Sequence, residues 1–81
     1  MTKLRSRDIY GKTVIEIRPK DDNMVEFAVV ETDKIRANMY VNELRAFAEE
    51  SGKSWQRLGN LIKINFGNTL EAEAACRVWY G

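Results

Sequence analysis

The sequence contains no histidine and only one cysteine, Cys76, among its 81 residues. Without histidine there is no zinc site of the usual kind, no Ser-His-Asp triad and no Cys-His pair. A lone cysteine excludes an internal disulfide, which suits a reducing compartment. We therefore expect a cytoplasmic protein that is not an enzyme and that binds neither a metal nor another cofactor.

Long apolar stretches, internal repeats and low-complexity tracts are also missing. No segment approaches the roughly 18 apolar residues that span a bilayer, and the first residues lack the apolar run of a secretory signal. We therefore expect no membrane partner. With 44% hydrophobic and 31% charged residues, the composition is that of an ordinary globular protein, and the length allows a single domain, residues 1–81.

The formal net charge is only +1, but the charges are unevenly distributed along the chain. Residues 1–20 carry six bases and two acids, whereas residues 21–52 carry three bases and eight acids. This contrast predicts two electrostatic faces, unless the fold brings the opposite charges together so that they neutralise each other.

The N-terminal third reads as an antiparallel hairpin. Alternating apolar and polar residues predict a strand at about residues 12–20, with Thr13, Ile15 and Ile17 facing inward and Val14 on the wetter side. Turn formers at residues 19–23 separate it from a second strand at about residues 24–31. A short strand is expected to precede this hairpin, with Tyr10-Gly11 as the bend.

Capping and periodicity signals in the middle of the chain predict a helix followed by a second hairpin. Asp33 is a plausible N-cap for a helix at about residues 33–51, and Gly52 is typical of a helix end. Residues 53–66 fit either helical or strand periodicity. The Gly59-Asn60 pair between two apolar segments favours a short hairpin at about residues 54–66 over a helix.

The last segment predicts a second helix at about residues 69–80. Asn68 and Glu71 have the spacing of a capping box, and Leu70, Ala74 and Trp79 are among the residues expected to face inward. The predicted fold is therefore α+β, an antiparallel sheet built from two hairpins, each followed by a helix.

Basic residues near the N-terminus are the main candidates for a binding site. Strands that carry them on one face would neutralise the phosphates of a nucleic acid, with an affinity that falls steeply as salt rises. Single-stranded DNA or RNA also needs flat side chains on which bases stack, and Tyr10 and Trp55 are the only candidates nearby. The candidate nucleic-acid-binding residues are Lys3, Arg5, Arg7, Tyr10, Lys12, Arg18 and Lys20.

The alternative is a protein-protein interaction adaptor, or a small regulatory protein of phage or plasmid type. Such a protein would dock through the acidic surface of the central helix or through the aromatic residues at the C-terminus. The candidate protein-binding residues are Glu43, Glu49, Glu50, Trp79 and Tyr80.

Residues 7–18 resemble a known signature. The segment Arg-Asp-Ile-Tyr-Gly-Lys-Thr-Val-Ile-Glu-Ile-Arg is similar to the strand-turn-strand motif of the PC4 family of single-stranded-DNA-binding transcriptional coactivators. The resemblance implies a curved sheet followed by a helix, a possible homodimer and a role in transcription regulation. It also implies that Arg7, Lys12 and Arg18 contact phosphates and that Tyr10 lies near the bases.

The chain departs from that family in three places. Ile9 stands where the family has an aromatic residue, and the strand at residues 24–31 lacks the basic, glycine-containing approach to the helix. About thirty residues also follow Ser51, where the family's helix closes the domain.

Overall fold

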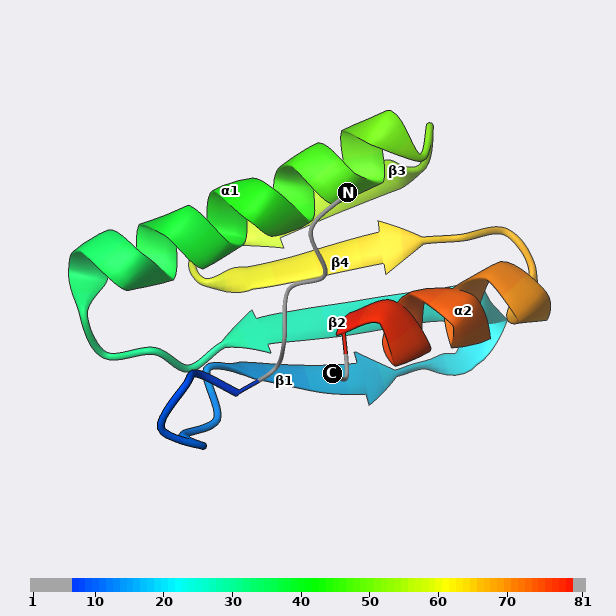
Figure 1. Cartoon of the computed structure of the whole chain (residues 1–81). Helices are drawn as coiled ribbons and strands as arrows, with labels where there is room; N and C mark the ends of the chain where they lie inside the picture. The colour runs from blue at the N-terminus through cyan, green and yellow to red at the C-terminus, as the bar shows by residue number, and fades with distance from the viewer. Residues whose placement is uncertain (1–6, 80–81) are drawn as a thin grey trace.

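The computed structural model describes residues 7–79, which form a four-stranded antiparallel sheet and two α-helices (Figure 1). The elements are β1 (Ile15–Pro19), the short 3₁₀ helix η1 (Asp21–Asn23), β2 (Met24–Val29), α1 (Lys34–Glu50), β3 (Ser54–Leu58), β4 (Leu61–Asn65) and α2 (Thr69–Trp79). The predicted α+β order of hairpin, helix, hairpin and helix is confirmed. Within residues 7–79, neither helix has the length and apolar character needed to cross a membrane.

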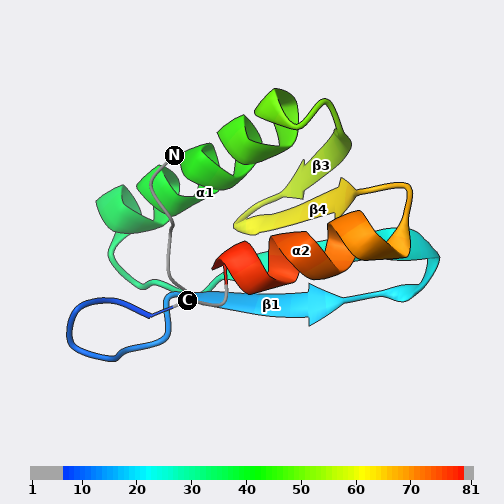
Figure 2. The same ribbon diagram turned by 45° about the vertical axis from the view of Figure 1, so that its right-hand side comes forward.

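The strands are ordered β1-β2-β4-β3, and each neighbouring pair is antiparallel. The chain therefore leaves β2, passes through α1 and returns at β3, while β4 fills the gap between those two strands. As a result, β1 and β3 are the edges of the sheet. Both helices cover the same face, α1 on the β3-β4 side and α2 on the β1-β2 side (Figure 2). We call the opposite side of the sheet the open face.

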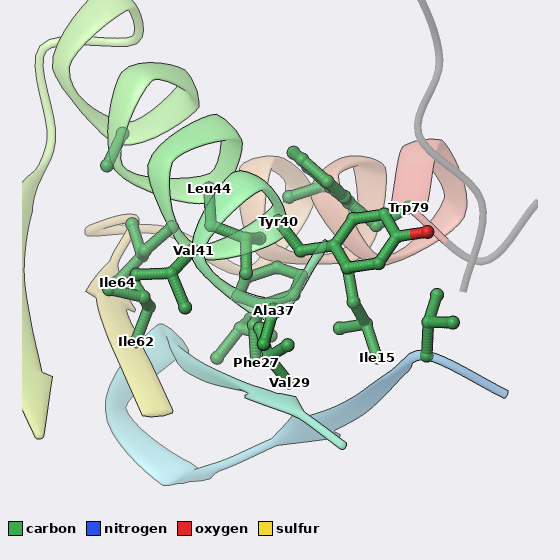
Figure 3. Packing of buried hydrophobic residues seen from close by; sticks show 14 of the residues in the cluster. Ile15, Phe27, Val29, Ala37, Tyr40, Val41, Leu44, Ile62, Ile64 and Trp79 are labelled. Atoms are coloured by element: carbon green, nitrogen blue, oxygen red, sulfur yellow. The ribbon is translucent and has the colours of Figure 1, made fainter. Parts of the chain in front are cut away.

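The core lies between the sheet and the two helices, as Figure 3 shows. Alternate strand residues such as Phe27, Ile62 and Ile64 point towards the helices and are fully buried. Trp79 joins the helices to the sheet, because its ring packs edge-on against Phe27 at 5.9 Å and against Phe47 at 5.4 Å between centroids. Such edge-to-face contacts add to the free energy gained from burying the rings.

Local hydrogen bonds explain why the predicted boundaries hold. A side-chain oxygen of Asp33 accepts hydrogen bonds from the backbone N–H groups of Ile35 and Arg36, both at 3.0 Å. Asn68 accepts from the Glu71 N–H at 2.8 Å and donates its amide to the Glu71 carboxylate at 2.7 Å. These contacts satisfy N–H groups at each helix start that have no partner inside the helix.

Four predicted orientations are wrong, two of them before β1 and two on α2. Val14 is fully buried because it precedes the regular part of β1, where its carbonyl accepts a hydrogen bond from the Val30 N–H at 2.9 Å. Thr13 is exposed because it pairs with Arg7 outside the sheet.

On α2, Leu70 is 76% exposed and Ala74 is exposed as well. Residues four apart share one face of a helix, and that face is opposite the stripe that buries Ala75 and Trp79. The N-terminal strand predicted before the Tyr10-Gly11 bend falls largely outside the described residues.

Candidate nucleic-acid interface

Residues 7–13 form a hydrogen-bonded turn before β1, which we call the 7–13 loop. The Asp8 N–H donates to the Lys12 carbonyl at 2.8 Å, and the Gly11 N–H donates to the Asp8 carbonyl at 3.0 Å. One carboxylate oxygen of Asp8 also accepts from the N–H groups of Tyr10 and Lys12, both at 2.9 Å. Gly11 has a φ of 80°, a left-handed conformation that glycine adopts without strain. The predicted bend is thus held by Asp8.

The loop holds two large side chains in solvent. Ile9 is 91% exposed and Tyr10 is 83% exposed, at the two central positions of the turn. Arg7 and Lys12 are exposed on either side of them. The ring of Tyr10 is therefore free to receive a stacked group, with a cationic residue on each side of it in the chain.

Lys12 is partly engaged by an acid. Its ammonium lies 3.8 Å from a carboxylate oxygen of Glu31, and Glu31 is buried. The same oxygen accepts a hydrogen bond from the Thr32 N–H at 2.9 Å. The Lys12 side chain still exposes 59% of its surface, so its ammonium can reach an anion in solvent while Glu31 offsets part of its charge.

The remaining basic candidates on β1 belong to the open face. Arg18 forms an ion pair with Glu16, and Lys20 lies 3.7 Å from Glu26. Glu26 also lies 3.7 Å from Lys63, which is its neighbour across the β2-β4 ladder. The open face therefore carries three cations, Arg18, Lys20 and Lys63, interspersed with two carboxylates, Glu16 and Glu26. Its positive potential, which would attract a polyanion, is weaker than the count of basic residues in the sequence predicts.

The predicted residues do not form one continuous surface. Arg7, Tyr10 and Lys12 lie in the 7–13 loop before β1, whereas Arg18 and Lys20 lie at its far end, and β1 itself spans about 13 Å. Lys3 and Arg5 fall outside the described residues.

Sequence reasoning missed Lys63. Its place between the buried residues Ile62 and Ile64 indicates that it points to the open face. That it joins Arg18 and Lys20 there depends on the pairing of β4 with β2, two strands that are distant in sequence.

The alternative protein-binding residues are also dispersed. Glu43 and Glu50 are seven residues apart and share one side of α1, while Glu49 lies on another side, 4.0 Å from Arg45. Partial burial raises the pKa of Glu43. Trp79 is only 4% exposed and belongs to the core, so a partner cannot reach it, and Tyr80 lies outside the described residues.

A shallow hollow of about 390 Å³ lies between the end of β1 and α2. Cys76 lines it, and burial raises the pKa of this thiol, which keeps it in the less nucleophilic protonated form at neutral pH. Among residues 7–79, no group of three or more histidine, cysteine or acidic side chains is arranged to hold a metal ion.

Comparisons of the chain with protein-family models, curated proteins and solved structures found no match. The resemblance of residues 7–18 to the PC4 motif therefore stays a prediction. The fold extends beyond what that resemblance implies, since β3, β4 and α2 follow α1.

Proposed function

We propose that the protein is a cytoplasmic binding module without catalytic activity that binds single-stranded nucleic acid through the 7–13 loop. Tyr10 stacks on a base, while Arg7 and Lys12 contact the neighbouring phosphates. Aromatic platforms combined with basic side chains are the usual means of binding single strands without strong sequence preference.

The exposure of Tyr10 on a hydrogen-bonded turn is the observation that supports this proposal. A large apolar side chain in solvent stabilises the fold little, so its presence at an ordered tip favours a role in binding. Because Asp8 already fixes the backbone of the turn, binding there loses less conformational entropy than it would in a mobile loop.

The open face provides a second, weaker contact in this proposal. Arg18, Lys20 and Lys63 attract the backbone of a strand that continues past the loop. Glu16 and Glu26 reduce this attraction, since each carboxylate already pairs with at least one of these cations. We therefore expect modest affinity with a shallow dependence on salt.

The test is binding of a fluorescently labelled single-stranded oligonucleotide, as DNA and as RNA, followed by anisotropy at low and high salt. Replacing Tyr10→Ala removes the stacking platform and should weaken binding by roughly 5- to 150-fold, because one stacked base contributes about 1–3 kcal/mol. The control is Ile9→Ala, which removes an equally exposed side chain without a π face and should leave the affinity nearly unchanged.

Two outcomes would contradict the proposal. One is the absence of salt-dependent binding to either oligonucleotide. The other is equal affinity of the Tyr10→Ala variant and the unaltered protein. Circular dichroism of both variants should match that of the unaltered protein, because neither side chain packs in the core.

A further inference from the structure

The strand β3 is an exposed edge of the sheet, and all five of its residues are exposed. It pairs with β4 in an uninterrupted register and contains neither a proline nor a bulge. No strand lies on its outer side within residues 7–79. Such an edge presents unpaired N–H and C=O groups that are ready to accept another strand, and most proteins protect their edges against this.

The two edges of this sheet differ in their protection. The β1 edge ends in Pro19, which cannot donate a ladder hydrogen bond. The only charged residue of β3 is Arg57, and its Nε donates to the Gly59 carbonyl at 2.8 Å. This bond holds the guanidinium towards the turn of its own hairpin, so the charge of Arg57 does little to prevent another strand from pairing with this edge. The β3 edge also carries the exposed apolar side chains of Trp55 and Leu58.

We propose that β3 pairs antiparallel with β3 of a second copy of the chain, about a twofold axis at Gln56. In this register Trp55 lies opposite the partner's Arg57, and Arg57 lies opposite the partner's Trp55. Both side chains are on the helix side of the sheet, because Trp55 pairs with the buried Ile64 and Arg57 with the buried Ile62. The twofold therefore sets no like charges directly opposite each other, and each Arg57 forms a cation–π pair with the partner's Trp55 by turning away from its own Gly59 carbonyl.

The charges of α1 favour a second copy over an unrelated partner. The helix begins with Lys34 and ends near Glu49, with no acid in its first turn and no base in its last. Both charges oppose the helix dipole, and within one chain Asp33 at the N-cap and Arg45, 4.0 Å from Glu49, offset this only in part. Phe47 faces α2 through its contact with Trp79, so Lys34 and Glu49 lie towards the flank of α1 that is nearer the β3 edge.

A twofold at Gln56 runs the two α1 helices antiparallel on the same side of the joined sheet. The cationic start of one α1 then lies near the acidic end of the other, and this attraction adds to the pairing that Glu49 already has with Arg45. Self-association of this kind is independent of nucleic-acid binding, because the 7–13 loop lies at the other edge of the sheet.

The test is sedimentation velocity over a wide range of protein concentration, without nucleic acid. The unaltered protein should approach twice the chain mass as its concentration rises, and hydrogen exchange should become slower at alternate amides of β3. The critical variant is Gln56→Glu. Within one chain the new carboxylate lies beside Lys63 and is tolerated. At the twofold axis, however, it lies opposite the identical carboxylate of the second copy, and the two repel each other. The dissociation constant of the dimer should rise by roughly tenfold or more.

The matched control is Gln56→Thr, which keeps a neutral strand former at the same position and should leave the dimer intact. Circular dichroism and thermal melting should be alike for both variants at low concentration. A protein that stays monomeric up to its solubility limit overturns the proposal. A dimer that Gln56→Glu weakens no more than Gln56→Thr also overturns it, because its interface would then lie elsewhere.

Discussion

Aromatic residues occupy opposite extremes of exposure in this chain, and the reason lies in their local backbone. Trp79 is 4% exposed, because helical periodicity carries it onto the buried stripe of α2. Tyr10 is 83% exposed, because it occupies a turn that Asp8 holds with its side chain. Periodicity in the sequence is sufficient to predict the first, whereas the second depends on hydrogen bonds that no apolar pattern reveals.

The contrast between Trp79 and Leu70 gives a prediction about stability. Replacing Trp79→Ala removes the ring that contacts Phe27 and Phe47 and should lower the free energy of unfolding by about 3–5 kcal/mol. Leu70→Ala on the same helix should change it by less than about 0.5 kcal/mol, because Leu70 is exposed. Urea denaturation followed by circular dichroism measures both. Equal losses would show that the two side chains are equally buried in solution.

At the scale of helices and strands, the sequence predicts most of the fold because the signals that end each element are local. Asp33, the Gly59-Asn60 turn and the Asn68–Glu71 pair lie where the structure has a cap, a hairpin turn and another cap. The errors arise where an element begins later than its pattern, as before β1 at Val14. They also arise on α2, which has apolar residues on two sides. Only the side with Ala75 and Trp79 faces the core, and the side with Leu70 and Ala74 is exposed.

The first turn of α2 gives a prediction about pH. The side-chain hydrogen bond from Lys53, assisted by the bond from Asn68, lowers the pKa of Glu71 from its ordinary value of 4.5. A carboxyl whose pKa is lower in the folded state stabilises the fold above its ordinary pKa, and this contribution is lost as the pH falls through the folded value.

We therefore expect Glu71→Gln to melt at a lower temperature than the unaltered protein at pH 7, with a difference that shrinks below about pH 4. The effect should be small, because the Glu71 side chain is exposed to solvent, which screens the ion pair. Glu73→Gln is the control, because it removes an exposed carboxylate from the same helix without touching the Lys53–Glu71 contact. A melting difference that is constant from pH 7 to pH 3 would exclude the ion pair as its cause.

At the scale of the whole molecule, strand pairing decides how the charges combine. The basic residues of the N-terminal region can be read directly from the sequence. Which of them are neutralised by acids depends on which strands become neighbours. Glu26 approaches both Lys20 and Lys63, and Lys63 joins it only because β4 lies next to β2. Interactions between residues this distant in sequence are not encoded in local patterns, so the extent of the candidate site could not be predicted.

The two proposals together predict how affinity depends on ligand length. If β3 strands join at the twofold, the sheet has eight strands and the two β1 edges lie about 34 Å apart. The 7–13 loops of the two copies are then remote from each other, and one short oligonucleotide cannot reach both. A longer strand that reaches both should bind more tightly through the high effective concentration of the second loop.

Anisotropy titrations with a short and a long oligonucleotide, at protein concentrations where the dimer is populated, measure this gain. The unaltered protein should favour the long ligand by more than the increase in the number of binding sites explains, and it should lose that excess when it is diluted to concentrations at which the dimer dissociates. Gln56→Glu should also lose the excess, while keeping its affinity for a ligand short enough to contact only the 7–13 loop, because its new carboxylate lies on the open face beside Lys63. Tyr10→Ala should weaken both ligands. If Gln56→Glu retains the excess, the gain comes from contacts within one chain, such as those to the open face, and joining of the β3 edges is not its source.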